Sequence, residues 1–124
     1  MQKITGVGGV FFKARDAKSL MEWYEQHLGL QFQHGFIQFN WADEPDHMPP
    51  GITTFSIFKE DSKHFSPSEK PYMINFRVSD LQALLTELKE KGVTIIGEMQ
   101  EYDYGKFGSI VDPEGNKIEL WQPL

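Results

Sequence analysis

Cysteine is absent from the 124-residue sequence. This absence excludes disulfide bonds, thiolate metal ligands and a cysteine nucleophile. No run of about 20 apolar residues is present, which is the length that a membrane-spanning helix needs, and residues 1–10 lack the basic and then apolar pattern of a signal peptide. We therefore expect a cytoplasmic protein that does not bind membranes.

Basic residues are also scarce. The 12 lysines and arginines are outnumbered by 18 acidic residues, which gives a formal net charge of −6. A negative chain does not attract nucleic acid, so we expect no nucleic-acid partner, and a neutral or cationic small molecule is the more compatible ligand. A hydrophobic fraction of 40% is too high for a disordered chain. We expect a single globular domain over residues 1–124.

Two amphipathic helices are predicted, each after an aspartate that can cap the first turn. The first follows Asp16 and ends at Gly29, and the second follows Asp80 and ends at Gly92. Short apolar strands precede them, at residues 7–14 and 72–78.

The two strand-helix segments form an internal repeat. A shift of 64 residues pairs Phe12 with Phe76, Asp16 with Asp80, Leu20 with Leu84 and Tyr24 with Leu88. Further strands are expected at 31–32, 36–41 and 52–59 in the first half, and at 93–96, 106–111 and 117–121 in the second.

The order βαβββ therefore occurs twice, in units of approximately 1–60 and 71–124. Residues 61–71 suit a polar linker and residues 42–51 a long loop, because both are rich in proline and polar residues. We expect an α+β fold whose two units form curved mixed sheets around a shared cleft, with the helices on the outer face.

Alternation along the strands predicts which side chains point into this cleft. Glu119 is the candidate catalytic base, and the candidate ligand-binding residues are Phe11, Lys13, Ser56, Phe58, Met73, Asn75, Arg77 and Trp121. The aromatic members of this set suit a planar ligand or simple core packing. Arg77 suits a ligand carboxylate or phosphate, or else neutralises Glu119.

The C-terminal run at residues 105–123 carries an Asp-Pro-Glu-Gly-Asn turn between two strands. Pro113 fixes φ in this turn and Gly115 permits a positive φ. The run resembles the C-terminal signature of glyoxalase-like proteins, and residues 12–30 resemble the first strand and helix of that family. With the repeat included, essentially the whole chain resembles the vicinal-oxygen-chelate superfamily, which includes glyoxalase I, the bleomycin-resistance proteins and dihydroxybiphenyl dioxygenase-like enzymes.

The resemblance also implies where metal ligands would lie. Metal-dependent members use up to four ligands, chiefly His and Glu, from the first and last strands of each unit. Alignment puts Gly9, Thr54 or Ser56, Met73 and Glu119 at these positions, and only Glu119 is a typical ligand. We therefore expect no metal and no cofactor. The histidines lie near a helix end or in predicted loops and are interpreted as surface residues: His27, His34, His47 and His64.

Two classes of function remain open. The first is a metal-free small-molecule binding protein of the bleomycin-resistance type. The second is a glyoxalase-like lyase, isomerase or dioxygenase, with an atypical metal site or with Glu119 as a base; Glu119 is alternatively a structural partner of a nearby cation. We also expect a homodimer, because single-chain members with two units often complete their clefts by pairing and Trp23 lies off the main apolar stripe of its helix.

Overall fold

The computed structural model describes residues 4–41 and 51–123, so the predicted loop at 42–51, apart from Gly51, and His47 lie outside the described residues. In chain order the elements are β1 (Ile4–Ala14), α1 (Ala17–Leu28), β2 (Phe36–Asn40), β3 (Ile52–Lys59), β4 (Tyr72–Val78), α2 (Leu81–Glu90), β5 (Thr94–Tyr102), β6 (Gly105–Val111) and β7 (Lys117–Pro123). No helix in these ranges is long and apolar enough to cross a membrane.

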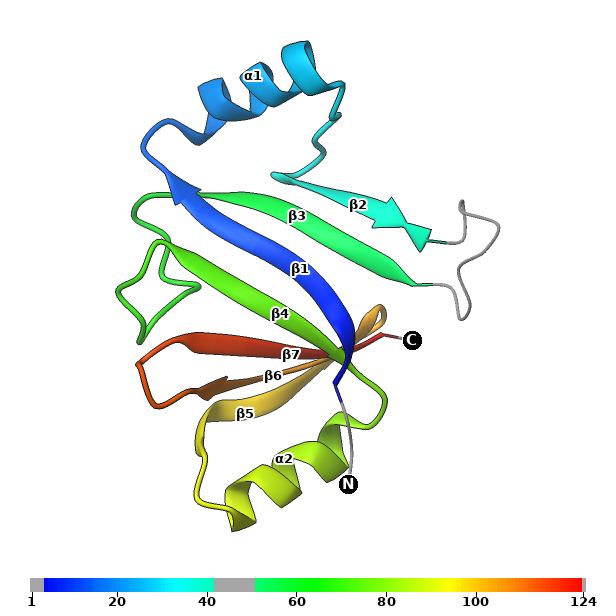
Figure 1. Ribbon diagram of the computed structural model, residues 1–124, viewed down its shortest axis with the longest axis vertical. Helices are drawn as coiled ribbons and strands as arrows, with labels where there is room; N and C mark the ends of the chain where they lie inside the picture. Colours follow the sequence, from blue (N-terminus) through cyan, green and yellow to red (C-terminus); the bar gives the residue numbers. More distant parts are fainter. Residues whose placement is uncertain (1–3, 42–50, 124) are drawn as a thin grey trace.

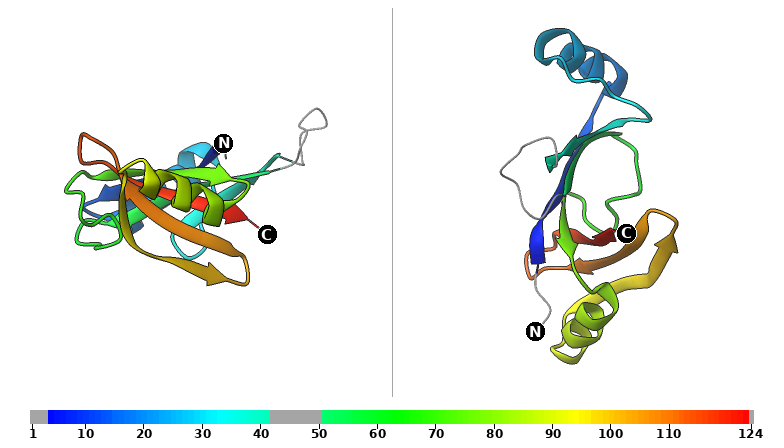
Figure 2. Two further views of the ribbon diagram at one scale, coloured as in Figure 1. Left: turned by 90° about the horizontal axis from the view of Figure 1, so that it is seen from below. Right: turned by 90° about the vertical axis from the view of Figure 1, so that its right-hand side faces the viewer.

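The strands form one seven-stranded sheet with the order β2-β3-β1-β4-β7-β6-β5. Strand β1 pairs antiparallel with β4, which joins the two units into one continuous sheet, while β1–β3 and β4–β7 are parallel pairs. The helices lie at opposite ends of the molecule (Figure 1). The sheet is bent, with the β5–β6 hairpin turned away from the central strands (Figure 2). The predicted α+β class and curved mixed sheet are confirmed.

Both predicted helix starts are confirmed by their caps. The Asp16 side chain accepts a hydrogen bond from the Ser19 backbone N–H at 3.0 Å, and Asp80 accepts one from the Ala83 N–H at 3.1 Å. Helix α1 ends at Gly29, whose φ of 70° is left-handed. Such a φ favours glycine because other residues are strained there.

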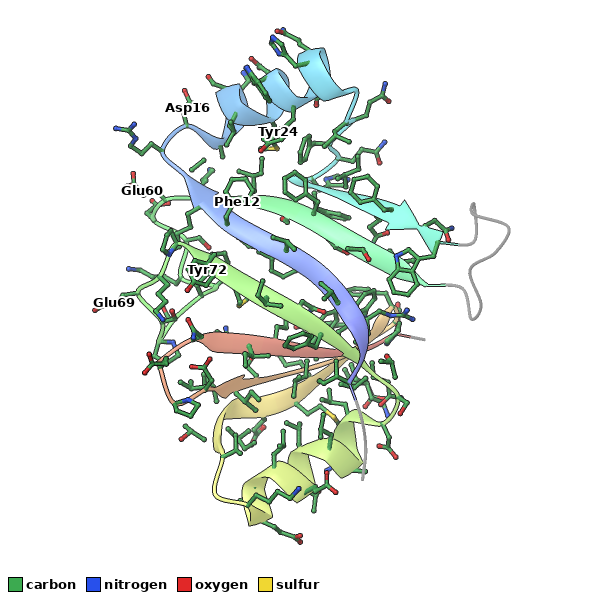
Figure 3. All side chains as sticks on the ribbon, viewed as in Figure 1. Phe12, Asp16, Tyr24, Glu60, Glu69 and Tyr72 are labelled. Atoms are coloured by element: carbon green, nitrogen blue, oxygen red, sulfur yellow. The ribbon has the colours of Figure 1, made fainter. Side chains whose placement is uncertain are left out.

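The apolar faces of the helices pack on the outer face of the sheet. Under α1, the Phe55 ring centroid lies 5.6 Å from that of Phe12 and 5.5 Å from that of Tyr24, and Figure 3 shows where Phe12 and Tyr24 project from β1 and α1. Under α2, the buried cluster contains Leu81 and Leu120. The alternating strand residues therefore face the opposite side of the sheet.

The Asp-Pro-Glu-Gly-Asn turn connects β6 to β7 as predicted. Asp112 Oδ1 accepts hydrogen bonds from the backbone N–H groups of Glu114 and Asn116, both at 2.9 Å. The Asn116 side chain donates to Oδ2, and these hydrogen bonds to the charged form lower the pKa of Asp112. Gly115 has a φ of 82°.

The first unit has one strand fewer than predicted. Residues 31–32 are not a strand, and only an isolated bridge joins Gln33 to Phe36. The Phe32 N–H points to the Glu25 carboxylate of α1 at 3.4 Å, and its ring packs against Tyr24 and Phe55. Residues 31–32 therefore pack against helix α1 instead of forming an additional strand of the sheet.

Trp23 is 47% exposed on α1. Its ring stacks on that of His27 with centroids 4.6 Å apart and meets the edge of the Tyr24 ring at 5.3 Å. The homodimer stays a prediction.

The predicted linker at residues 61–71 is packed against the sheet. Phe65 is fully buried and forms a cluster with Phe11 and Met73. Its ring centroid lies 4.9 Å from that of Phe58. The segment connects β3 to β4, as expected of a linker, and one aromatic side chain within its polar sequence anchors it to the sheet.

Replacing Phe65 with alanine should lower the free energy of unfolding by about 3 kcal/mol, because the change leaves a cavity in a buried aromatic cluster. Urea denaturation followed by circular dichroism measures the shift. The control is Lys63→Ala, at an exposed position in the same loop, with an expected change within about 0.5 kcal/mol. Equal midpoints for the two variants would contradict the packed loop.

Candidate functional site

A cavity of about 690 Å³ lies on the face of the sheet opposite the helices. Its lining residues include Phe11, Ser56 and Glu119, which alternate along their strands with the helix-facing Phe12, Phe55 and Leu120. The strand register that sequence alternation predicts is thereby confirmed for β1, β3 and β7.

The pairing of the central strands sets one row of residues across the floor of the cavity. Gly9 on β1 is the register partner of Thr54 on β3 and of Asn75 on β4, and Asn75 is the partner of Glu119 on β7. A Cβ atom at Gly8 would come within 2.0 Å of Asn75 Oδ1. Glycine at position 8 therefore leaves the space that the Asn75 amide occupies.

Glu119 is the central polar group of this row. It is 8% exposed, and the Asn75 amide donates a hydrogen bond to its Oε1 at 2.7 Å. His64 Nε2 lies 3.2 Å from its Oε2. A buried carboxylate is costly unless it is hydrogen-bonded, so these two partners hold Glu119 in place and fix its direction.

Lys117 is the nearest lysine on the same strand. Burial lowers the pKa of its ammonium group, and attraction to the Glu119 carboxylate opposes that shift. Its Nζ donates to the backbone carbonyl of His64. Lys117 therefore helps to hold the loop that carries His64.

Aromatic rings stand on both sides of Glu119. One set, which we term the aromatic ladder, consists of Trp121, Phe107, Tyr102 and Tyr104. Phe107 and Trp121 are nearly parallel with ring centroids 6.1 Å apart, and Tyr102 and Tyr104 are nearly parallel at 5.3 Å.

On the β1–β3 side, the Phe58 ring stacks on that of His64 with centroids 5.2 Å apart, and Phe11 lies next to Phe58 at 5.6 Å. All of these rings line the cavity. The cavity therefore offers flat apolar surfaces around one carboxylate.

Six of the residues that the sequence nominated line the cavity: Phe11, Ser56, Phe58, Asn75, Glu119 and Trp121. Lys13, Met73 and Arg77 share the same strands but do not line it. Met73 is 1% exposed because the loop places Phe65 against it, and the Lys13 ammonium lies over the Phe65 ring at 5.3 Å.

Arg77 is held between two indole rings. Its guanidinium carbon lies 5.3 Å from the Trp41 ring centroid and 5.9 Å from that of Trp121. Packing against the loop and Trp41 therefore keeps Lys13, Met73 and Arg77 from lining the cavity, where they were expected to contact the ligand.

Sequence reasoning missed His64 and the ladder members Phe107, Tyr102 and Tyr104. His64 is exposed, as expected, but its ring also lines the cavity beside Glu119. Phe107 could have been found, since it pairs with Trp121 on the neighbouring strand and alternation puts both on one face. No periodic pattern marks His64, which lies in an irregular loop.

The fold is that of a glyoxalase-like protein. The chain belongs to the Glyoxalase/Bleomycin resistance protein/Dioxygenase superfamily, whose family model matches residues 10–120. No curated protein matches the chain.

Several solved structures share the fold. Methylmalonyl-CoA epimerase from Mycobacterium tuberculosis is 23% identical, with 98% of this chain and 89% of that chain covered and a TM-score of 0.59. A variant of methylmalonyl-CoA epimerase from Streptomyces coelicolor, in complex with 2-nitronate-propionyl-CoA, is 17% identical over 98% and 99% of the two chains, with a TM-score of 0.72. A superfamily member from Vibrio splendidus 12B01 is 11% identical over 98% and 99%, with a TM-score of 0.59.

The side chains of the central row, and Met73 at one of the expected ligand positions, do not fit a divalent metal. Gly9 has no side chain, Met73 is a buried thioether, and the Asn75 amide turns its N–H toward Glu119 instead of its oxygen toward a shared centre. Within residues 4–41 and 51–123, no group of three or more His, Asp or Glu side chains lies close enough to hold a metal ion. Catalytic sites normally need at least three such donors.

Protein purified without added metal should contain far less than one equivalent of zinc, nickel, manganese or iron, because a lone carboxylate–imidazole pair binds them weakly. Elemental analysis by mass spectrometry measures the content. Treatment with EDTA should leave the melting temperature unchanged, since little bound metal is there to remove. Near-stoichiometric metal that disappears in Glu119→Ala would contradict this assignment of donors.

Proposed function

We propose that this protein binds a small molecule without a metal, in the cavity between the aromatic ladder and the Phe58–His64 pair. The observation that carries the proposal is a cavity walled by aromatic rings around one oriented carboxylate. A volume of about 690 Å³ falls within the range of small-molecule sites, which are mostly apolar with a few placed polar groups.

Ligand capture of the bleomycin-resistance type agrees with this arrangement. Both Glu119 oxygens already have protein partners, Asn75 and His64. A carboxylate held in this way is suited to recognise a donor group on a ligand. The central row offers no Lewis acid site for the metal-dependent chemistry of related enzymes.

An enzyme that uses Glu119 as a base is the second candidate. The distance of 3.2 Å between His64 Nε2 and Glu119 Oε2 favours it, because a paired carboxylate and imidazole can relay a proton. Such an enzyme would abstract or return a proton on a bound substrate, as a lyase or an isomerase does.

A thermal-shift screen of small metabolites and drugs tests the binding proposal, because a ligand that binds only the folded state raises the melting temperature. Tyr104→Ala should weaken each true ligand about tenfold by removing an exposed ring from the cavity wall. The control is Tyr72→Ala, which removes another exposed tyrosine, one that does not line the cavity, and should have no effect.

Ligands whose affinity is unchanged by Tyr104→Ala would contradict binding at this cavity. Each hit is also incubated with the protein in deuterated water and examined by proton NMR. Recovery of unchanged ligand supports a binding protein. Deuterium incorporation that is lost in Glu119→Gln would instead support the enzyme.

A further inference from the structure

We infer that the ligand is a cation, with a planar ring against the aromatic ladder and a positively charged nitrogen at Glu119. This inference rests on the proposed function and names the chemical class of its ligand. Three independent features of the cavity carry it: its charge, the partners of Glu119, and the faces of its rings.

The described residues that line the cavity carry a negative charge without a matching lysine or arginine. Glu119 is the one carboxylate among them, and His64 is the one other titratable side chain besides the tyrosines. Three basic residues on nearby strand positions do not line the cavity. Lys13 lies over Phe65 and Arg77 lies between Trp41 and Trp121. Lys117 attracts the Glu119 carboxylate, but its ammonium group donates to the backbone carbonyl of His64. An anionic ligand would meet the Glu119 carboxylate in a partly dehydrated space, where like charges repel strongly.

The two oxygens of Glu119 differ in how firmly they are held. Oε1 accepts from the Asn75 amide, which is 2% exposed and fixed within the sheet. Oε2 contacts His64, whose side chain is 44% exposed and belongs to a loop. A ligand ammonium group can therefore replace or share the His64 contact while Asn75 keeps the carboxylate aimed at the cavity, since a carboxylate oxygen accepts more than one hydrogen bond.

The aromatic rings favour the same charge. The face of an aromatic ring carries negative potential, so it attracts a nearby cation and repels an anion. The Phe107–Trp121 and Tyr102–Tyr104 pairs present near-parallel ring planes, at 6° and 5° respectively. A planar ring can stack on such surfaces while its charged substituent reaches Glu119 on the neighbouring floor.

Three probes that differ in one functional group test the inference: 2-naphthylmethylamine, 2-naphthylmethanol and 2-naphthoate. Isothermal titration calorimetry at pH 7 and low salt measures their affinities. The amine should bind about tenfold or more tightly than the alcohol, which corresponds to about 1.4 kcal/mol for one charge-assisted contact. The carboxylate should bind most weakly.

Glu119→Gln should bring the amine-to-alcohol ratio of affinities close to unity, because it removes the charge and retains an oxygen for Asn75. Glu101→Gln is the matched control. It makes the same change in net charge at an exposed position that lies 3.9 Å from Lys106 and does not line the cavity, and it should leave the ratio as in the unmodified protein.

His64→Ala gives a second readout that leaves Glu119 in place. The ratio of amine to alcohol affinities should stay the same or rise, since a competitor for Oε2 is gone, while loss of the His64 ring from the cavity wall weakens both probes alike. Loss of the amine preference in His64→Ala would overturn the inference, as would a preference that survives Glu119→Gln.

The failure of this inference can be told apart from failure of the proposed function. If the alcohol or the carboxylate binds as tightly as the amine, and Tyr104→Ala weakens it, the cavity binds ligands but does not select cations. If none of the three probes binds at millimolar concentration, both the cation inference and the binding of planar molecules at this cavity are overturned.

Discussion

The pairing of β1 with β4 is the constraint on which the rest of the structure depends. It joins two units that repeat each other in sequence into one curved sheet. Each helix then packs on the outer face near one end of the sheet (Figure 1), and the cavity lies on the inner face of the central strands. The same pairing aligns Gly9 with Asn75, and Asn75 with Glu119, so the register of the backbone determines which side chains meet at the cavity floor. The site is therefore a consequence of how the two units are joined.

Burial of the Glu119 charge is the main energetic demand that this arrangement creates. Asn75 offsets part of this cost by donating a hydrogen bond to Glu119. The Asn75 amide fits there because Gly8 has no side chain to occupy the same space. His64 offsets another part of the cost through its contact with the second oxygen of Glu119. The loop that carries His64 is anchored by the buried Phe65 and by Lys117. These contacts hold Glu119 as a hydrogen-bonded carboxylate. The chain retains the fold of the superfamily.

Local sequence patterns were sufficient to predict both helices, their capping aspartates and the face of each central strand. Such patterns work because 3.6-residue and two-residue periodicities record which side of an element is buried. They failed for residues 31–32, whose apolar side chain packs under α1 while no strand partner is present. They gave no sign of the contact between His64 and Glu119 or of the position of Arg77, because a loop and Trp41, which follows β2, determine those contacts. The alternation that placed Trp121 on the cavity face could also have placed Phe107, its partner on β6, on that face.

The ligand site that we propose lies on the inner face of the sheet, beside Glu119, and not on the helices. The chain has 3 tryptophans, and two of them report on the two alternatives: Trp121 lines the cavity, whereas Trp23 is exposed on α1. Two-dimensional nitrogen-15 NMR resolves their indole N–H signals. On addition of 2-naphthylmethylamine, the Trp121 signal should shift in proportion to saturation while the Trp23 signal stays fixed, because the ring current of the ligand acts only at short range. A shift of Trp23 with Trp121 unchanged would contradict the account.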